Sequence, residues 1–119
     1  MRSSAFRDLK VWQKAMDLTI EIYKIVKHLP KEETYALSDQ MRRAAVSIPS
    51  NIAEGQGRIT SKEFIRFLSM ARGSLGELST QLEICERLQY LDSSNTSTAH
   101  NLILEITKMV NALSKSLSD

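Results

Sequence analysis

The sequence predicts an all-α fold, an antiparallel up-down-up-down four-helix bundle formed by a single domain over residues 1–119. Three observations lead to this prediction. Apolar residues recur every three or four positions along four separate segments, which is the period of a helix with one buried face. Residues that break helices are rare, with four glycines and two prolines in 119 residues. The stretches between the four patterns are short, and short connections require consecutive helices to lie antiparallel.

The first helix is predicted over residues 8–29, with Asp8 as its N-cap and Pro30 preventing its continuation. Its apolar residues form two adjacent stripes, and together these cover more than the roughly 100° that a helix packed on one side needs. We therefore predict that one part of this helix packs inside the bundle and that another part faces a second subunit. The residues assigned to this oligomer interface are Val11, Trp12, Ala15, Leu18 and Ile22.

The second helix is predicted over residues 33–54 and contains Pro49. Proline has no N–H to donate to the carbonyl four residues earlier, so we expect a kink, with the hydroxyl and amide side chains at positions 47, 50 and 51 bonding the freed backbone groups. Gly55 and Gly57 are expected to end the helix in the left-handed conformation. The kinked segment could shape a ligand site, although a proline kink more often only bends a helix around its neighbours. The structural motif of this region is assigned to Pro49, Asn51, Glu54, Gly55 and Gly57.

The third helix is predicted over residues 61–90, capped by the hydroxyl side chain at position 60 or 61. Gly73 and Gly76 lie inside it, and a glycine in a helix interior costs about 1 kcal/mol relative to alanine. The simplest compensation is the close approach of a neighbouring helix backbone. The fourth helix is predicted over residues 97–117 and is capped by a hydroxyl side chain at position 96 or 97.

No grouping of residues in the sequence is typical of catalysis or of metal binding. His28 and His100 are far apart, and neither has a second ligand three or four residues away. Cys85 falls on the apolar stripe of the third helix, where a free cysteine behaves as a small core residue. We therefore expect no catalytic residue, no metal site and no cofactor, and we predict that the protein is not an enzyme.

The composition limits the partners and the location. The net charge of +2 is too small to indicate nucleic-acid binding by itself. A single cysteine excludes an internal disulfide and fits a reducing compartment. No apolar run is long enough for a signal peptide or a membrane span. We expect a cytoplasmic protein that makes no contact with a membrane.

Basic residues gather in the sequence around the end of the second helix and the start of the third. One interpretation is a phosphate-contacting surface, to which each cation adds a salt-dependent term that does not depend on base sequence. The alternative is a set of interface salt bridges, in which the arginines pair with Glu54, Glu77 or Glu83 of neighbouring helices. The residues assigned to nucleic-acid binding are Arg42, Arg43, Arg58, Lys62 and Arg66.

Three blocks of sequence resemble one bacterial family. They are FRDLKVWQKAMDL at 6–18, QMRRAAVSIPSNIAEGQGR at 40–58 and FIRFLSMARGSLGELSTQLE at 64–83. They are similar to the four-helix bundle proteins called 23S rRNA intervening sequence proteins, also known as the S23 ribosomal protein family. The chain also resembles the accessory variability proteins of diversity-generating retroelements. These resemblances imply a homopentameric barrel of four-helix bundles without enzymatic activity.

Two functions follow from the residues and the resemblance together. The first is a non-enzymatic, oligomeric bundle that binds structured RNA and is associated with 23S rRNA intervening sequences. The alternative is a scaffold that docks a nucleic-acid-handling protein, so that this partner contacts the nucleic acid. The partners we expect are therefore further copies of the chain, rRNA or another structured RNA, and such a protein.

Overall fold

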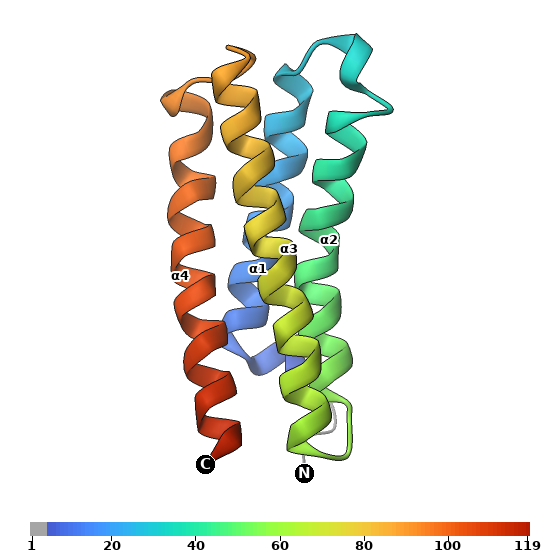
Figure 1. Cartoon of the computed structure of the whole chain (residues 1–119), viewed down its shortest axis with the longest axis vertical. Helices are drawn as coiled ribbons and strands as arrows, with labels where there is room; N and C mark the ends of the chain where they lie inside the picture. The colour runs from blue at the N-terminus through green and yellow to red at the C-terminus, as the bar shows by residue number, and fades with distance from the viewer. Residues whose placement is uncertain (1–4) are drawn as a thin grey trace.

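The computed structural model describes residues 5–119, which form four long α-helices and three short 3-10 segments. The bounds are α1 (Lys10–Ile25), α2 (Leu37–Gln56), α3 (Ser61–Arg87) and α4 (Ser93–Ser118), with η1 (Ala5–Asp8) before α1 and η2 (Val26–His28) and η3 (Lys31–Glu33) between α1 and α2. The helices run alternately up and down, and α1 and α3 each pack against both α2 and α4 (Figure 1). No strand occurs among the described residues. The all-α, four-helix prediction is confirmed.

One continuous core runs along the bundle, whose extents are 46 × 22 × 20 Å. It forms because the apolar residues repeat at helical spacing on each of the four helices, so that each helix turns one face inward. Burying one large aliphatic side chain stabilises the fold by about 1.5–3 kcal/mol. The largest fully buried side chains include Leu18, Ile22, Met41, Ile48, Ile52, Leu68, Leu75, Leu78, Leu82 and Ile106.

The interface predicted on the first helix requires correction. Val11, Ala15, Leu18 and Ile22 are buried by the other helices of the same chain, so they have no surface left for another subunit. Trp12 is only partly buried and makes an edge-to-face contact with Phe6, with ring centroids 5.3 Å apart. The apolar arc is wide because its inner stripe faces the core, whereas its outer stripe, with Met16, Ile20 and Tyr23, remains exposed.

Several helix ends differ from their predicted positions. Leu9, not Asp8, occupies the N-cap of α1. The second helix begins at Leu37 rather than near residue 33, because Lys31–Glu33 form a separate 3-10 turn. The fourth helix begins at Ser93 rather than near residue 97.

Two caps explain where α3 and α4 begin. The Thr60 hydroxyl accepts a hydrogen bond from the Glu63 N–H at 3.2 Å, as expected for the cap of α3. Asp92 caps α4 by accepting from the Ser94 N–H at 2.9 Å, while the Asn95 amide oxygen accepts from the Asp92 N–H at 3.0 Å. This reciprocal capping box satisfies backbone donors at the helix start, so residues that resemble a polar turn become helical.

α2 continues through Pro49 because another helix satisfies the carbonyl that the proline leaves free. The orphaned acceptor is the carbonyl of Ala45, four residues before Pro49. The Thr19 hydroxyl of α1 lies 3.2 Å from it and 2.8 Å from the Ala15 carbonyl, so its single proton is shared between two acceptors. The nearby polar side chains that we expected in this role bond elsewhere: Asn51 donates to the Ser47 carbonyl, for example.

The prediction that Gly55 and Gly57 adopt a left-handed conformation is wrong. Gly57 caps α2 with φ −80°, and no glycine among the described residues has a positive φ. Gly55 lies inside α2, where an added Cβ would sit 2.7 Å from the Cβ of Phe67 and 2.9 Å from the Phe64 ring. Its role is therefore to let the end of α2 approach the start of α3 closely.

Candidate nucleic-acid interface

Three of the predicted cations gather at the turn between α2 and α3, at one end of the bundle. Arg58 lies in the turn itself, and Lys62 and Arg66 lie one turn apart at the start of α3. Ile59, beside Arg58, is 95% exposed. The turn therefore presents cations around an exposed aliphatic side chain.

Phe67 positions two of these cations. The guanidinium carbons of Arg58 and Arg66 lie 4.8 and 4.7 Å from the centroid of its ring, within the range of a cation–π interaction. Phe67 is itself buried, with its Cβ against Gly55. The absence of a side chain at Gly55 lets the ring pack close to α2, so that both arginines lie over it.

Carboxylates offset part of this positive charge. Arg58 pairs with Glu54 at 2.8 Å, and Arg66 pairs with Glu63 at 3.0 Å. The hydrogen bond and the charge of Arg66 lower the pKa of the Glu63 carboxyl, so Glu63 is ionised at neutral pH. Exposed pairs of this kind contribute only about 0–1 kcal/mol, so either arginine can exchange its carboxylate for a phosphate at small cost.

The other two predicted cations lie elsewhere. Arg43 pairs with Asp39 at 3.1 Å, and Arg42 lies 3.9 Å from the same carboxylate while donating to the Thr34 carbonyl. Arg43 is 15 residues before Arg58, about 22 Å along the chain at the helical rise of 1.5 Å per residue. Within one subunit the five cations therefore form two groups.

The alternative interpretation of the arginines paired them with Glu54, Glu77 or Glu83 of neighbouring helices. Such pairs between helices are absent from the described part of the chain. Glu54 instead pairs with Arg58, four residues along the same segment, and Glu83 pairs with Arg87 of its own helix.

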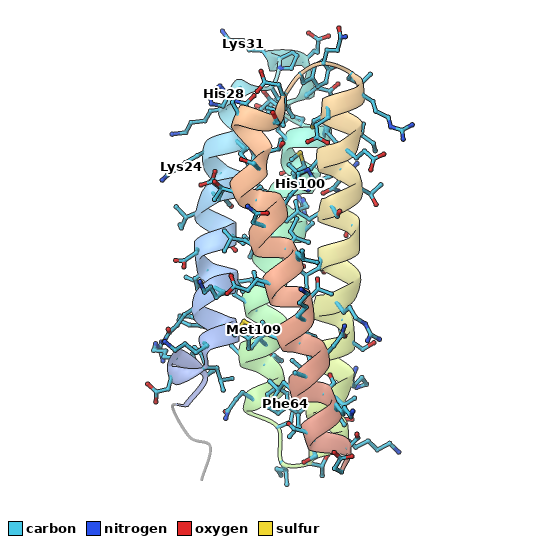
Figure 2. All side chains as sticks on the ribbon, turned by 90° about the vertical axis from the view of Figure 1, so that its left-hand side faces the viewer. Lys24, His28, Lys31, Phe64, His100 and Met109 are labelled. Atoms are coloured by element: carbon cyan, nitrogen blue, oxygen red, sulfur yellow. The ribbon has the colours of Figure 1, made fainter. Side chains whose placement is uncertain are left out.

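A third basic group was not predicted. Lys24, His28 and Lys31 follow one another along α1 and the segment after it, at the end of the bundle opposite Phe64 (Figure 2). Among the described residues, neither lysine makes an ion pair with a carboxylate. Their spacing of three to four residues is the signal that could have identified them.

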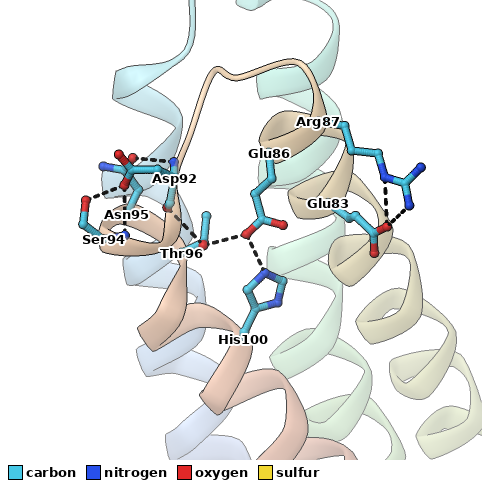
Figure 3. A network of polar contacts seen from close by, with 8 residues as sticks. All are labelled: Glu83, Glu86, Arg87, Asp92, Ser94, Asn95, Thr96 and His100. Carbon is cyan, nitrogen blue, oxygen red and sulfur yellow. Dashed lines mark hydrogen bonds and ion pairs between the residues drawn. The ribbon is translucent and has the colours of Figure 1, made fainter.

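A polar network joins α3 to α4 near the end of the bundle where Lys31 lies (Figure 3). The Thr96 hydroxyl donates to the Glu86 carboxylate at 2.7 Å, and Nε2 of His100 lies 3.0 Å from the same oxygen. The Thr96 hydrogen bond, followed by that of His100, lowers the pKa of Glu86. Because all three groups satisfy one another between two helices, the network holds the helices in register.

No second chemistry is assembled around this network. Burial raises the pKa of the neighbouring Cys85 thiol to about 11, so it is protonated at neutral pH and packs with its sulfur 3.7 Å from that of Met41. The described residues contain no cluster of three or more His, Cys, Asp or Glu side chains that could hold a metal ion. No helix within residues 5–119 is long and apolar enough to cross a membrane.

Comparison with known families gives the chain its place. The family described as 23S rRNA-intervening sequence protein matches residues 7–112, which is most of the sequence. The chain belongs to this family. The matched region includes all five predicted cations and extends into α4, beyond the three blocks from which the resemblance was drawn.

A solved structure shows the same fold in a second member of the S23 ribosomal protein family. It is a protein of unknown function from Bacteroides thetaiotaomicron, 26% identical in sequence, with a TM-score of 0.81. The similarity covers 88% of this chain and 98% of that one, so the two bundles correspond over nearly their whole length. No curated protein matches the sequence.

Proposed function

We propose that this chain is a non-enzymatic, homo-oligomeric bundle that binds structured RNA through the phosphate backbone, using the turn between α2 and α3. The observation that carries this proposal is the convergence of Arg58, Lys62 and Arg66 at one end of the bundle, with both arginines held over Phe67. The family's association with 23S rRNA intervening sequences supports an RNA partner. The number of copies that the family resemblance implies is five.

Oligomerisation would make this weakly charged turn an effective binding surface. A single turn carries three cations, of which two are paired with carboxylates, and so offers little affinity alone. When several copies contact one RNA, each further contact becomes intramolecular, and the overall affinity can exceed that of one site by a factor of about 10²–10⁴.

Binding to a structured rRNA hairpin, titrated from low to physiological salt, tests the proposal. We expect saturable binding and a log–log salt slope of several units. Replacing Arg58, Lys62 and Arg66 together by alanine should weaken binding at least about tenfold and lower the slope by about 1 for each phosphate that is no longer bound. Arg87→Ala is the matched control, because Arg87 pairs with Glu83 four residues earlier, as Arg58 does with Glu54, but at the opposite end of the bundle.

Each outcome has a clear meaning. Equal losses in the triple variant and in Arg87→Ala would reduce the effect to general charge and overturn the assignment to this turn. Arg43→Ala reports on the second group of cations separately. Absence of binding even at low salt would remove the RNA function from this chain.

The second candidate function is a scaffold that docks a nucleic-acid-handling protein. The pairing of Arg43, Arg58 and Arg66 with carboxylates close to them in the chain favours it, because it leaves little uncompensated charge for phosphates. Pull-down from lysate with and without nuclease separates the two functions. A protein that stays bound after nuclease treatment supports the scaffold, whereas loss of every partner supports direct RNA binding.

A further inference from the structure

Two apolar faces of the bundle are uncovered within one chain. The first is the α1–α2 groove, formed by Met16, Ile20 and Tyr23 of α1 and Val46 of α2, each of which is more than a third exposed. Tyr23 and Val46 line a surface hollow together with Arg42. Large apolar side chains gathered on one face, rather than scattered singly, are typical of an interaction surface.

The second face is the outer side of α3, where Met70, Gly73, Gly76, Thr80 and Ile84 are exposed. A Cβ added at Gly73 or Gly76 would meet nothing within 4 Å. The close helix approach predicted from these glycines is therefore absent within the chain. A glycine inside a helix destabilises it relative to alanine, and no contact within one subunit compensates for that cost.

The two faces stand at the same height along the bundle. The bond between the Thr19 hydroxyl and the Ala45 carbonyl aligns α1 with α2, and the 2.6 Å hydrogen bond between Ser47 and Ser74 aligns α2 with α3. Counting residues from these contacts, with neighbouring helices antiparallel, converts a position on α1 into its level on α3. A shift of one residue along one helix corresponds to one residue, about 1.5 Å, along the others.

This count matches the two faces position by position. Met16 comes level with Gly73, and Tyr23 comes level with Thr80. Ile20 comes level with the residue directly after Gly76. The three apolar side chains of α1 therefore span the same stretch, about 10 Å long, as the smooth part of α3.

Charges on the two faces are complementary. Arg43, at the edge of the α1–α2 groove, has a side chain that is 79% exposed. Glu77, on the outer side of α3, stands one residue from the level of Arg43 by the same count. Within the chain, Arg43 pairs with Asp39, and Glu77 accepts a long 3.4 Å hydrogen bond from Gln81.

We propose that the outer face of α3 in one copy of the chain docks into the α1–α2 groove of the next copy. Because the two surfaces differ, the contact is head-to-tail, and a head-to-tail contact either closes into a ring or continues as a filament. Equal heights mean that neighbouring copies are not displaced along the bundle axis, so the assembly closes as a ring. All copies in the ring point the same way, which places every α2–α3 turn at one end. The meaning of that end for RNA rests on the proposed function, but the contact does not.

Filling the smooth part of α3 tests the contact. In the double variant Gly73→Gln with Gly76→Gln, the new side chains meet open space within the chain, and glutamine is a good helix former. We expect the wild-type protein to sediment as a defined oligomer at about 10 µM, and the variant to associate at least tenfold more weakly with unchanged helical content. The matched control is Asn101→Gln with Ala112→Gln, at two exposed positions of α4 away from both faces. A monomeric wild type, or a glycine variant that assembles as the wild type does, would overturn the proposal.

Cysteine cross-linking tests the head-to-tail geometry. Ile20→Cys and Gly76→Cys should each give no disulfide-linked product alone, a linked dimer when the two single variants are mixed, and a ladder when both changes are in one chain. The native Cys85 is buried and does not interfere. Efficient cross-linking of Ile20→Cys to itself would mean that like faces meet, and would contradict the head-to-tail contact.

Both experiments use nuclease-treated protein, so assembly is measured without RNA. An oligomer that binds no rRNA hairpin at low salt would leave the contact standing and remove the proposed function. A protein that binds the hairpin while remaining monomeric would do the reverse.

Discussion

Thr19 and Pro49 depend on each other across two helices. Pro49 removes the donor that would satisfy the Ala45 carbonyl, and the buried hydroxyl of Thr19 lies 3.2 Å from that carbonyl. A buried backbone acceptor without a partner costs about 1–3 kcal/mol. The threonine thus makes a proline tolerable in the middle of a core helix.

Thr19→Val should lower the free energy of unfolding by about 1–3 kcal/mol, since valine keeps the shape but donates nothing. The same change in a Pro49→Ala background should cost at least about 1 kcal/mol less, because residue 49 then donates its own N–H to Ala45. Urea unfolding of the four proteins of this cycle gives the coupling. Additive effects would show that Thr19 acts through packing alone.

At the scale of the element, the end of α3 carries conformational strain. Gln89 has φ 63°, the one positive value among the described non-glycine residues. The N–H groups of Tyr90 and Gln89 bond the carbonyls of Cys85 and Glu86, which is the pattern of a Schellman motif with a glutamine where glycine is usual.

Gln89→Gly should therefore raise the free energy of unfolding by up to about 1 kcal/mol, since a left-handed conformation costs about 1–2 kcal/mol for a residue with a side chain. Gln89→Ala keeps that cost and serves as the control. Denaturant unfolding of both variants measures the difference. If alanine stabilises as much as glycine, the gain comes from removing the glutamine side chain and not from the backbone.

The contact between α3 and α4 should be sensitive to acid. The hydrogen bonds of Thr96 and His100 hold the pKa of Glu86 below its ordinary value of 4.5. Their contribution to stability is therefore complete above that value and is lost as the pH falls through the lower pKa of the folded state. Glu86→Gln should flatten the decline of unfolding free energy between about pH 5 and pH 3.

Urea unfolding at several pH values measures this slope. Glu32→Gln is the control, because Glu32 is an exposed carboxylate of the 3-10 segment that precedes α2. If both variants change the slope equally, the acid sensitivity belongs to the overall charge and not to the network.

At the scale of the whole molecule, the fold could be predicted from the sequence because periodicity is a local property. Leu18 and Ile22 fall on one stripe whichever helices cover it, so their burial followed from spacing. Which stripe of α1 is left uncovered did not follow, because two adjacent apolar stripes look alike until the positions of α2 and α4 are known. The structure covers the inner stripe and exposes the outer one with Ile20.

The candidate site was only partly predictable for the same reason. Arg58, Lys62 and Arg66 are close in sequence, and the turn keeps them close in space. Arg43 was grouped with them through helical spacing, which places residues on one face but leaves them far apart along it. The carboxylate partners follow from pairs three or four residues apart, whereas the roles of Phe67 and Gly55 require knowing how α2 meets α3.

The up-down path of four helices also places α1's first residue and α4's last residue at the same end as the cationic turn (Figure 1). An affinity tag or fluorescent fusion added at either terminus would therefore lie beside Arg58 and Lys62, where it could mask or imitate a binding effect. A small label introduced at Lys31 would lie at the far end of the bundle. For surface immobilisation, attachment at that far end leaves the turn facing solution, which makes it the better choice for any binding measurement on this protein.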